Sequence, residues 1–238
     1  MQEPELRQPE MDESLARMAA AGNYTSWLLG RARPYLGGSV VDLGAGIGTF
    51  SEPLAAELDV VAVEPDRRLA DLPRARAEGN QRLTVVDGDA ETLRRLGRRF
   101  DSILCLNVLE HIEDDAAALQ ACFEALEPGG HLLLLVPAHE LLFGAVDELA
   151  GHVRRYSSRA VRQQLEAAGF AVVELQHVNP AGALGWLVFS KLLRRSQVPQ
   201  GPLAVYDRFV PLLRLLDRLR LPFGLSLWAV ARRPAGRR

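Results

Sequence analysis

The sequence predicts an α/β protein: a Rossmann-like, mostly parallel sheet of about seven strands with helices on both faces. From residue 39 onward, short apolar segments alternate with longer amphipathic ones, which is typical of repeated strand–helix pairs. The short segments, such as His131–Val136, are apolar at almost every position, as expected for parallel strands that helices cover on both sides. In such a sheet, ligands bind beyond the carboxyl ends of the strands, where the strand order reverses.

Each expected element follows from this alternation and from turn residues. Strands are expected at residues 39–43, 60–64, 83–87, 101–106, 131–136, 170–177 and 224–232. Helices are expected at 48–58, 66–77, 114–126 and 158–168, and Gly169 ends the last of these as a C-cap glycine. The turn Pro128-Gly129-Gly130 is expected to separate the third helix from the fifth strand.

Three segments lie outside the alternation. Residues 1–11 are acidic and rich in Pro and Gln, and a disordered tail is expected there. Residues 12–37 carry a helical pattern and are expected to form an N-terminal helical lid, which Gly22 interrupts. Residues 38–238 form the main domain, in which the segment 178–223 is an α-helical insertion before the last strand. We expect this insertion to cover the site of a second substrate.

Composition restricts the class of protein. A net charge of −2 over 238 residues gives no general attraction to nucleic acid, so none is expected as a partner. Cys105 and Cys122 lie in apolar segments and are expected to be buried, reduced thiols. The acidic N-terminus lacks the apolar core of a signal peptide, and no apolar run is long enough to span a membrane. These features predict a cytoplasmic protein.

The stretch VVDLGAGIGTF, residues 40–50, joins the first strand to the first helix of the sheet. Gly44, Gly46 and Gly48 permit a sharp turn and a close approach of a ligand to the main chain. The G-x-G-x-G spacing differs from the G-x-G-x-x-G of dinucleotide folds, and Asp42 would be a poor neighbour for a pyrophosphate. A ligand with a cationic tail would tolerate this carboxylate.

Glu64 ends the second strand, at a distance along the chain where a carboxylate can bind both hydroxyls of a ribose. With Asp42 and the glycines, it predicts an adenosyl ligand with a cationic tail. Over about residues 38–177 the chain resembles the class I S-adenosylmethionine-dependent methyltransferases that act on small molecules. The resemblance rests on five ordered stretches: VVDLGAGIGTF (40–50), VVAVEPD (60–66), VVDGDAETL (85–93), FDSILCLNVLEHIEDD (100–115) and LEPGGHLLLLVP (126–137).

The resemblance implies S-adenosylmethionine as the cofactor and a role for each matching position. Asp42 would hold the loop and the ammonium end of the cofactor, and Glu64 would bind the ribose. The other implied positions are Gly44, Ala45, Gly46 and Gly48 along the methionine and ribose, Pro65 and Asp66 beside the adenine, Asp89 at the adenine amino group with Ala90 nearby, and Asn107 at the methionine side. Three of the polar residues also fit a structural role: Asp89 in a turn, Asn107 as a helix cap, and His111 in the core.

The long segment 137–161 leaves the carboxyl end of the fifth strand, and long loops in that position often carry function. Related methyltransferases show a similar D-x-x-x-G-H-x-R-R-Y-S stretch, here Asp147 to Ser157. His152 is the candidate base, with Tyr156 and Asp147 as further catalytic candidates. Alternatively, His152 and Tyr156 pack the loop onto the sheet while Arg154 and Arg155 pair with local acids. Ser157 or Ser158 is expected to cap the next helix.

No metal site is expected in this segment. His139, Asp147, Glu148 and His152 are ligand-type side chains, but their spacing is not the close spacing of a metal site. In the lid, Tyr24 either binds the carboxylate of the cofactor or packs with Trp27 against the edge of the sheet.

The insertion interleaves apolar residues with arginines and Lys191. It could form an apolar acceptor pocket, a homodimer surface or a peripheral contact with an anionic membrane, without stable insertion. The simplest interpretation is that the helices of the insertion are amphipathic, with one buried apolar face and one solvated charged face. A monomer and a homodimer both remain open.

The sequence thus predicts transfer of a methyl group from S-adenosylmethionine to a small, partly apolar acceptor by in-line displacement. Oxygen, nitrogen and carbon acceptors all remain open. The alternative is a non-catalytic cofactor- or partner-binding protein on the same fold. The loop spacing and Asp42 disfavour an NAD-dependent oxidoreductase, and the charge balance disfavours a nucleic acid methyltransferase.

Overall fold

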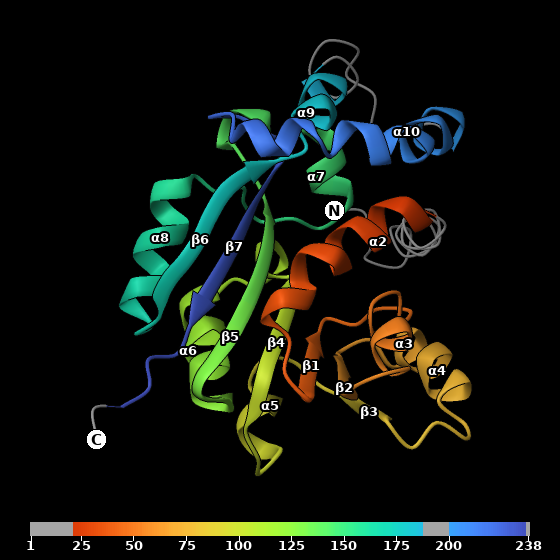
Figure 1. The fold of residues 1–238 in the computed structure, drawn as a ribbon, viewed down its shortest axis with the longest axis vertical. Coiled ribbons are helices and arrows are strands. Elements are labelled where there is room, and N and C mark those ends of the chain that lie inside the picture. Colours follow the sequence, from red (N-terminus) through yellow and green to blue (C-terminus); the bar gives the residue numbers. More distant parts are fainter. Residues whose placement is uncertain (1–20, 188–199, 237–238) are drawn as a thin grey trace, which may run out of the picture.

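A computed structural model of the chain describes residues 21–187 and 200–236, so the expected tail at 1–11 lies outside the described residues. Seven strands form one sheet in the order β3-β2-β1-β4-β5-β7-β6 (Figure 1). Strand β7 runs antiparallel to both of its neighbours, and the other pairs are parallel. The strands are β1 (Ser39–Leu43), β2 (Asp59–Glu64), β3 (Leu83–Asp87), β4 (Phe100–Leu106), β5 (Leu126–Pro137), β6 (Ala171–Val178) and β7 (Ser226–Arg232).

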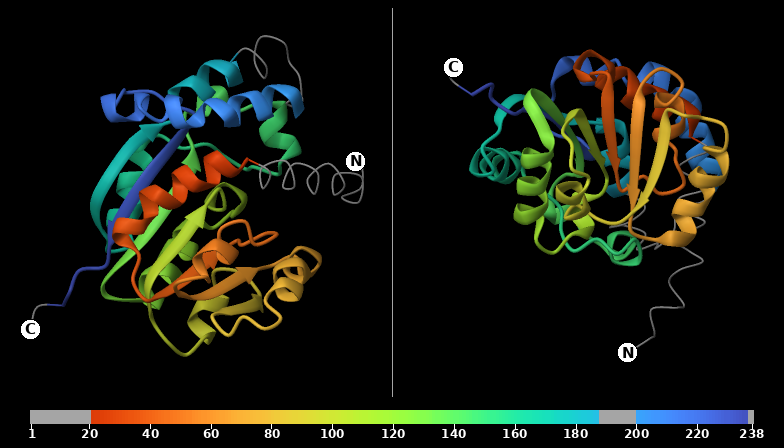
Figure 2. Two further views of the ribbon diagram at one scale, coloured as in Figure 1. Left: turned by 45° about the vertical axis from the view of Figure 1, so that its right-hand side comes forward. Right: turned by 90° about the horizontal axis from the view of Figure 1, so that it is seen from below.

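Alternate residues of the central strands point to opposite faces of the sheet and build two separate cores. In β1, Val41 packs into the core beneath α5 (Thr92–Arg95), α6 (Asp115–Ala125) and α8 (Ser158–Ala167). Its neighbour Val40 packs into the core beneath α2 (Gly22–Ala32), α3 (Ser51–Leu54) and α10 (Gln200–Leu213). The sheet therefore lies between two layers of helices (Figure 2), which explains why both faces of its strands are apolar.

The expected strands are confirmed, with one difference at the start of β5. This strand begins at Leu126, immediately after α6, and so includes the expected turn Pro128-Gly129-Gly130. The pairing with β4 shifts between Ser102 and Phe100, so the turn residues form a bulge within the strand. The remaining boundaries differ from expectation by two residues or fewer.

One expected helix is shorter in the structure. The first helix of the sheet, expected at 48–58, is the single turn α3, because Gly46 and Gly48 hold positive φ angles of 55° and 86° that an α-helix cannot include. In the described part of the lid, helix α2 begins at Gly22, where the break in the helical pattern was expected, and continues into η2 (Arg33–Tyr35); residues 12–20 lie outside the described residues. Helix α4 (Arg67–Arg76) follows β2, and Asp66 caps it by accepting a hydrogen bond from the amide of Arg68.

The insertion between β6 and β7 contains α9 (Pro180–Trp186), α10 and η6 (Leu216–Leu219). Because β7 is antiparallel, the insertion both leaves and re-enters the sheet at the carboxyl edge of the parallel strands (Figure 1). Helix α10 also packs on α2, so the described parts of the lid and of the insertion lie together. Within residues 21–187 and 200–236, no helix is long and apolar enough to cross a membrane.

Candidate active site

The candidate site lies at the carboxyl edge of the sheet, where the strand order reverses between β1 and β4. Strands β2 and β3 lie on one side of β1, and β4 and β5 lie on the other. Every sequence-predicted site residue but two follows or ends one of these strands. The exceptions are Asp42, which lies within β1, and Tyr24, which lies in α2.

The glycine loop after β1 has a backbone that only glycine adopts without strain. Gly44 has a φ of 70°, and a Cβ atom there would lie 2.4 Å from a methyl carbon of Val108. The amides of Gly44 and Ala45 both donate to the carbonyl of Val63 in β2, at 2.8 and 3.1 Å. The loop is therefore folded back over the end of β2 and packed against the segment that follows β4.

Glu64 braces this loop from the end of β2. Its Oε2 accepts a hydrogen bond of 2.7 Å from the amide of Gly46, and its Oε1 accepts one of 3.0 Å from the amide of Asp66. Burial raises the pKa of this carboxyl, while the two amide hydrogen bonds act in the opposite direction. A carboxylate can accept about four hydrogen bonds, so Glu64 keeps acceptor capacity for the two hydroxyls of a ribose.

Asp42 is buried and faces α3. Its Oδ2 accepts a hydrogen bond of 2.5 Å from the hydroxyl of Ser51. Burial raises the pKa of Asp42 to about 6, even though the Ser51 hydroxyl opposes the shift. This contact gives Asp42 a definite role in holding the loop to the helix behind it. Ser51 is a partner that the sequence motif did not identify.

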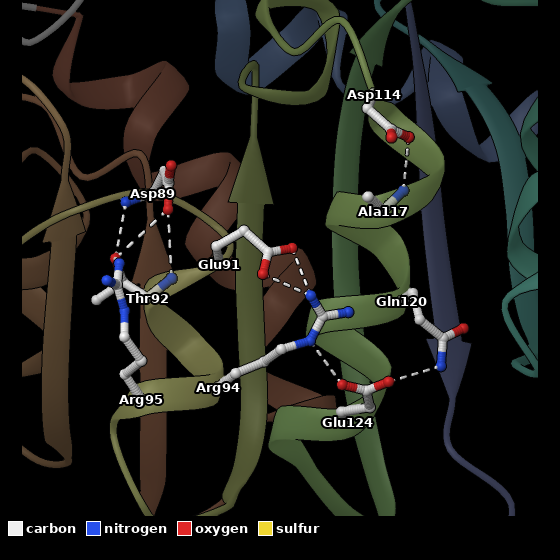
Figure 3. Close-up of polar contacts among 9 residues, drawn as sticks. All are labelled: Asp89, Glu91, Thr92, Arg94, Arg95, Asp114, Ala117, Gln120 and Glu124. Carbon is white, nitrogen blue, oxygen red and sulfur yellow. Dashed lines mark hydrogen bonds and ion pairs between the residues drawn. The ribbon is translucent and has the colours of Figure 1, made fainter.

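Asp89 lies in the turn after β3 and is hydrogen-bonded to Thr92 (Figure 3). The Asp89 amide donates to the Thr92 hydroxyl at 3.2 Å, and the Thr92 amide donates to Oδ1 of Asp89 at 3.3 Å. Asp89 therefore has the structural role in a turn that was considered from the sequence. The Asp89 side chain is exposed and its neighbour Ala90 is buried, so a contact from Asp89 to a ligand is still available.

Two further cofactor candidates have backbones fixed by distant elements. Asn107, after β4, has a φ of 56° and donates its amide to the carbonyl of Leu135 at 2.8 Å. Tyr24 packs against Trp27, with 5.3 Å between ring centroids. Its amide donates to Oδ1 of Asp207 in α10 at 2.9 Å. The packing of Tyr24 with Trp27 is thus present in the structure, and both side chains join the apolar core on that face of the sheet.

The loop 138–157 is organised around the buried carboxylate of Asp147, in α7 (Ala145–Leu149). Its Oδ1 lies 2.9 Å from both Nδ1 of His152 and Nε of Arg155, and its Oδ2 accepts from the Gly144 amide. Burial alone would raise the pKa of Asp147, but His152 and Arg155 outweigh it and the pKa is lowered. A carboxylate only accepts, so Nδ1 of His152 carries a hydrogen, and in the neutral ring the lone pair then lies on Nε2.

Tyr156 and Arg154 attach this loop to α6. The Tyr156 hydroxyl lies 3.1 Å from the carbonyl of Leu109 and 3.0 Å from Oδ2 of Asp115, and its ring is buried. Arg154 donates to the same Asp115 oxygen at 2.8 Å. The pairing of Arg154 and Arg155 with local acids therefore occurs, although Asp115 was not identified from the sequence.

Glu110, in η3 (Leu109–His111), was also missed, because it stands as one acid in the apolar run NVLEHI. Its side chain is fully buried, and neither carboxylate oxygen has a hydrogen-bond partner. Burial raises its pKa to about 8. Its Oε1 lies 3.9 Å from Nε2 of His152, too far for a hydrogen bond.

His111 completes a cluster with Glu110 and His152. The rings of the two histidines meet edge to face, with 4.8 Å between centroids. His111 is exposed and does not lie in the core as considered from sequence. Desolvation of its ring, with help from His152, lowers its pKa to about 4, so its imidazole is neutral at physiological pH. One ligand-type atom of each of the three residues lies within 4.8 Å of the others, so a divalent ion could bind here, unlike at the set considered from sequence.

Comparison with known proteins gives a match between residues 5–175 and a family model described as a methyltransferase domain. The chain is 37% identical to the ubiquinone biosynthesis O-methyltransferase of Ruegeria pomeroyi over 105 residues, which cover 43% of this chain and 42% of that protein. It is 28% identical to the enzyme of the same name from a Chelativorans species over 170 residues, covering 70% of this chain and 57% of that protein. The chain thus spans about half the length of these relatives.

Solved structures share the fold at low sequence identity. A putative methyltransferase from Bacillus halodurans matches with a TM-score of 0.60 and 22% identity, over 88% of this chain and 98% of that one. The phosphoethanolamine N-methyltransferase 2 of Haemonchus contortus, solved with S-adenosylmethionine, matches with a TM-score of 0.63 and 19% identity. That match covers 89% of this chain and 52% of the other.

Proposed function

The chain belongs to the methyltransferase-domain family, whose cofactor is S-adenosylmethionine, and on that premise we propose that it methylates a small, partly apolar acceptor at the carboxyl edge of the sheet. The observation that carries the proposal is the loop of Gly44–Gly48 held by Glu64. It combines tight glycines, half-buried at Gly44 and Gly46, which allow a ligand to approach the backbone, with a carboxylate that has acceptor capacity left. A pyrophosphate would gain nothing from Glu64 or Asp42, whereas a ribose and an ammonium group would.

In this proposal the cofactor lies across the ends of β1, β2, β3 and β4. Glu64 binds the ribose hydroxyls, and the loop backbone meets the methionine part. The other proposed contacts are Pro65 and Asp66 beside the adenine, Asp89 at the adenine amino group with Ala90 nearby, Asn107 at the methionine side, and Tyr24 from the lid. Asp42 acts through the loop, since its carboxylate is bonded to Ser51.

The acceptor is proposed to lie over the end of β4, near His152. Methyl transfer breaks the bond from sulfur to the methyl carbon and forms one from the acceptor atom to that carbon, and the sulfur leaves as a neutral thioether. No acid is needed for the leaving group, but a hydroxyl acceptor must lose its proton. His152 suits this task because Asp147 orients the ring through Nδ1, so that Nε2 is the nitrogen that accepts a proton in the neutral ring.

Within this set, Asp147 and Tyr156 are positioning residues. Asp147 orients the imidazole of His152, and Tyr156 anchors the loop to α6 through Asp115 and Leu109. A base is required for a hydroxyl acceptor and not for a carboxylate, so the His152–Asp147 pair favours a hydroxyl oxygen as the methylated atom. The O-methyltransferase names of the relatives agree with this choice. The insertion at 178–223 would cover the acceptor.

The test is to measure S-adenosylhomocysteine formed from S-adenosylmethionine with a panel of small apolar phenols and catechols. His152→Ala is expected to lower turnover about 10²- to 10⁴-fold while leaving cofactor affinity unchanged, as for loss of a general base. His131→Ala serves as the control, because His131 starts the regular pairing of β5 at the opposite edge of the sheet.

Unchanged turnover in His152→Ala would show that His152 is not the general base. Cofactor binding without turnover on any acceptor would favour the second candidate, a non-catalytic cofactor-binding protein. That candidate draws support from the extent to which Asp147 and Tyr156 are engaged in bonds within the protein.

A further inference from the structure

The segment from α10 through η6 presents two apolar stripes, one facing inward and one facing outward. The inward stripe contains Tyr206, Val210 and Leu213, and Val210 is buried against the core beneath α2. The outward stripe contains Phe209, Leu212, Leu216 and Leu219, which follow each other at intervals of three and four residues. A surface helix normally places charged and polar residues on the face away from the core.

The outward stripe is strongly exposed. Leu212 and Leu219 are 62% and 65% exposed, and Phe209 is 51% exposed. Leu184 of α9, Leu187 directly after it and Phe223 beside β7 are exposed as well. Most of the large exposed apolar side chains among the described residues therefore belong to this one insertion. Single exposed leucines are ordinary, but a contiguous group of this kind marks an interaction surface.

The charged residues around the stripe all have the same sign. Arg208, Arg214, Arg218 and Arg220 are exposed, and none of them forms an ion pair with another residue of the described ranges. The two acids of this segment are occupied elsewhere. Asp207 accepts hydrogen bonds from the start of α2, and Asp217 is buried and accepts from the amide of Asn179.

We propose that the outward face of α10 and η6, with the neighbouring Leu184 and Leu187, docks this protein onto an anionic lipid bilayer. Arginines that flank an exposed apolar stripe suit a bilayer surface, because the leucines enter the boundary of the acyl chains while the guanidinium groups stay among anionic headgroups. A second copy of the chain would bring four arginines against four arginines, an arrangement that charge repulsion disfavours.

The place of α10 and η6 in the fold determines which part of the protein docking brings near the bilayer. The insertion stands at the carboxyl edge of the sheet (Figures 1 and 2). Docking through its outer face would hold that edge near the bilayer, where apolar molecules are dissolved. The inference concerns where the protein binds and does not depend on the proposed methyl transfer, so the two can fail separately.

The test is flotation of the full chain with vesicles of phosphatidylcholine alone and with vesicles that also contain phosphatidylglycerol. We expect binding to the anionic vesicles, little binding to the neutral ones, and weaker binding as salt is raised. The double variant Arg214→Glu/Arg218→Glu should bind at least about tenfold more weakly, since each basic residue near an anionic surface contributes about fivefold. Leu212→Ser/Leu219→Ser should also lose most of the binding.

Two matched variants separate this surface from general effects. Arg99→Glu/Arg159→Glu makes the same change of charge at exposed arginines outside the insertion, and Leu72→Ser/Val173→Ser replaces two exposed apolar residues of α4 and β6. Both should bind anionic vesicles like the unchanged protein. The proposal is overturned if the unchanged protein does not bind anionic vesicles, or if the matched variants lose as much binding. It is also overturned if the protein is a dimer in solution that Leu212→Ser/Leu219→Ser converts to a monomer.

Discussion

Two buried glutamates stand at the carboxyl edge of the sheet, and their surroundings differ completely. Glu64 ends β2, and each of its carboxylate oxygens accepts a hydrogen bond from a backbone amide. Glu110 follows β4, and neither of its carboxylate oxygens has a hydrogen-bond partner. The first carboxylate is built into a backbone loop, whereas the second is buried without compensation beside His111 and His152.

The difference separates the two halves of the candidate site. The cofactor half, around Gly44–Gly48 and Glu64, is held by main-chain hydrogen bonds that follow from a local motif. The acceptor half, around Glu110, Asp147 and His152, is held by side chains from α6, from α7 and from the loop between α7 and α8. A buried polar group without a partner often marks a place where a ligand or proton acts, so the acceptor half is where new chemistry should be sought.

The largest expected effect is in the acceptor half, at Asp147. Asp147→Ala removes the partner of Arg155, which is 3% exposed, and should lower the free energy of unfolding by about 3–5 kcal/mol. Urea unfolding measures this loss. Glu148→Ala, at the exposed neighbouring position, should change stability by less than about 0.5 kcal/mol. Equal effects in the two variants would mean that the ion network does not hold the loop.

The pH dependence of stability isolates the unpaired carboxyl of Glu110. Its folded-state pKa of about 8 exceeds the ordinary value of 4.5, so the folded state binds its proton more tightly than the unfolded state does. This group therefore destabilises the protein as pH rises between those two values.

Glu110→Gln should remove this dependence and stabilise the protein by about 4 kcal/mol at pH 8, compared with little change at pH 4.5. Unfolding curves collected across this range give the difference. The exposed Glu113→Gln is the control and should follow the unchanged protein. A parallel pH profile in Glu110→Gln would show that the carboxyl finds a partner in solution.

The glycine loop of the cofactor half can be tested with a pair of matched glycines. Gly44 and Gly97 have similar φ angles of 70° and 67°, but a Cβ at Gly97 meets nothing within 4 Å whereas one at Gly44 meets Val108. Both alanine variants incur the cost of a left-handed backbone, about 1 kcal/mol or somewhat more. Gly44→Ala should cost about 2 kcal/mol beyond that, because of the clash. Chemical denaturation compares them, and equal losses would contradict the close packing of the loop on Val108.

The smallest expected effect concerns the contact between the lid and the insertion. Asp207 accepts hydrogen bonds from the amides of Asn23 and Tyr24 at the start of α2, which has no cap of its own. Asp207→Ala should cost about 1 kcal/mol and increase hydrogen exchange in the first turn of α2. Asp207→Asn keeps an acceptor and should retain most of the protection. Unaltered exchange in both variants would show that Asp207 does not hold the lid.

The two halves also differ in how far the sequence predicted them. The sheet and the cofactor half follow from patterns within a few residues, such as the spacing of Gly44, Gly46 and Gly48 or Glu64 at the end of a strand. The roles of Ser51, Asp115 and Asp207 were not predicted, since each depends on contacts between segments far apart or on a side chain outside a motif. Glu110 was missed because one acid in an apolar run carries no local signal of its burial.

Calorimetric titration of S-adenosylhomocysteine into the full chain tests the central claim, that the loop and Glu64 form an adenosyl site. We predict saturable binding at one site per chain. Glu64→Ala should weaken it by about 2–4 kcal/mol through the loss of two hydrogen bonds to a carboxylate. Asp59→Ala, at the opposite end of β2, should leave it unchanged. Absence of binding to the folded protein, or equal affinity in Glu64→Ala, would contradict the account.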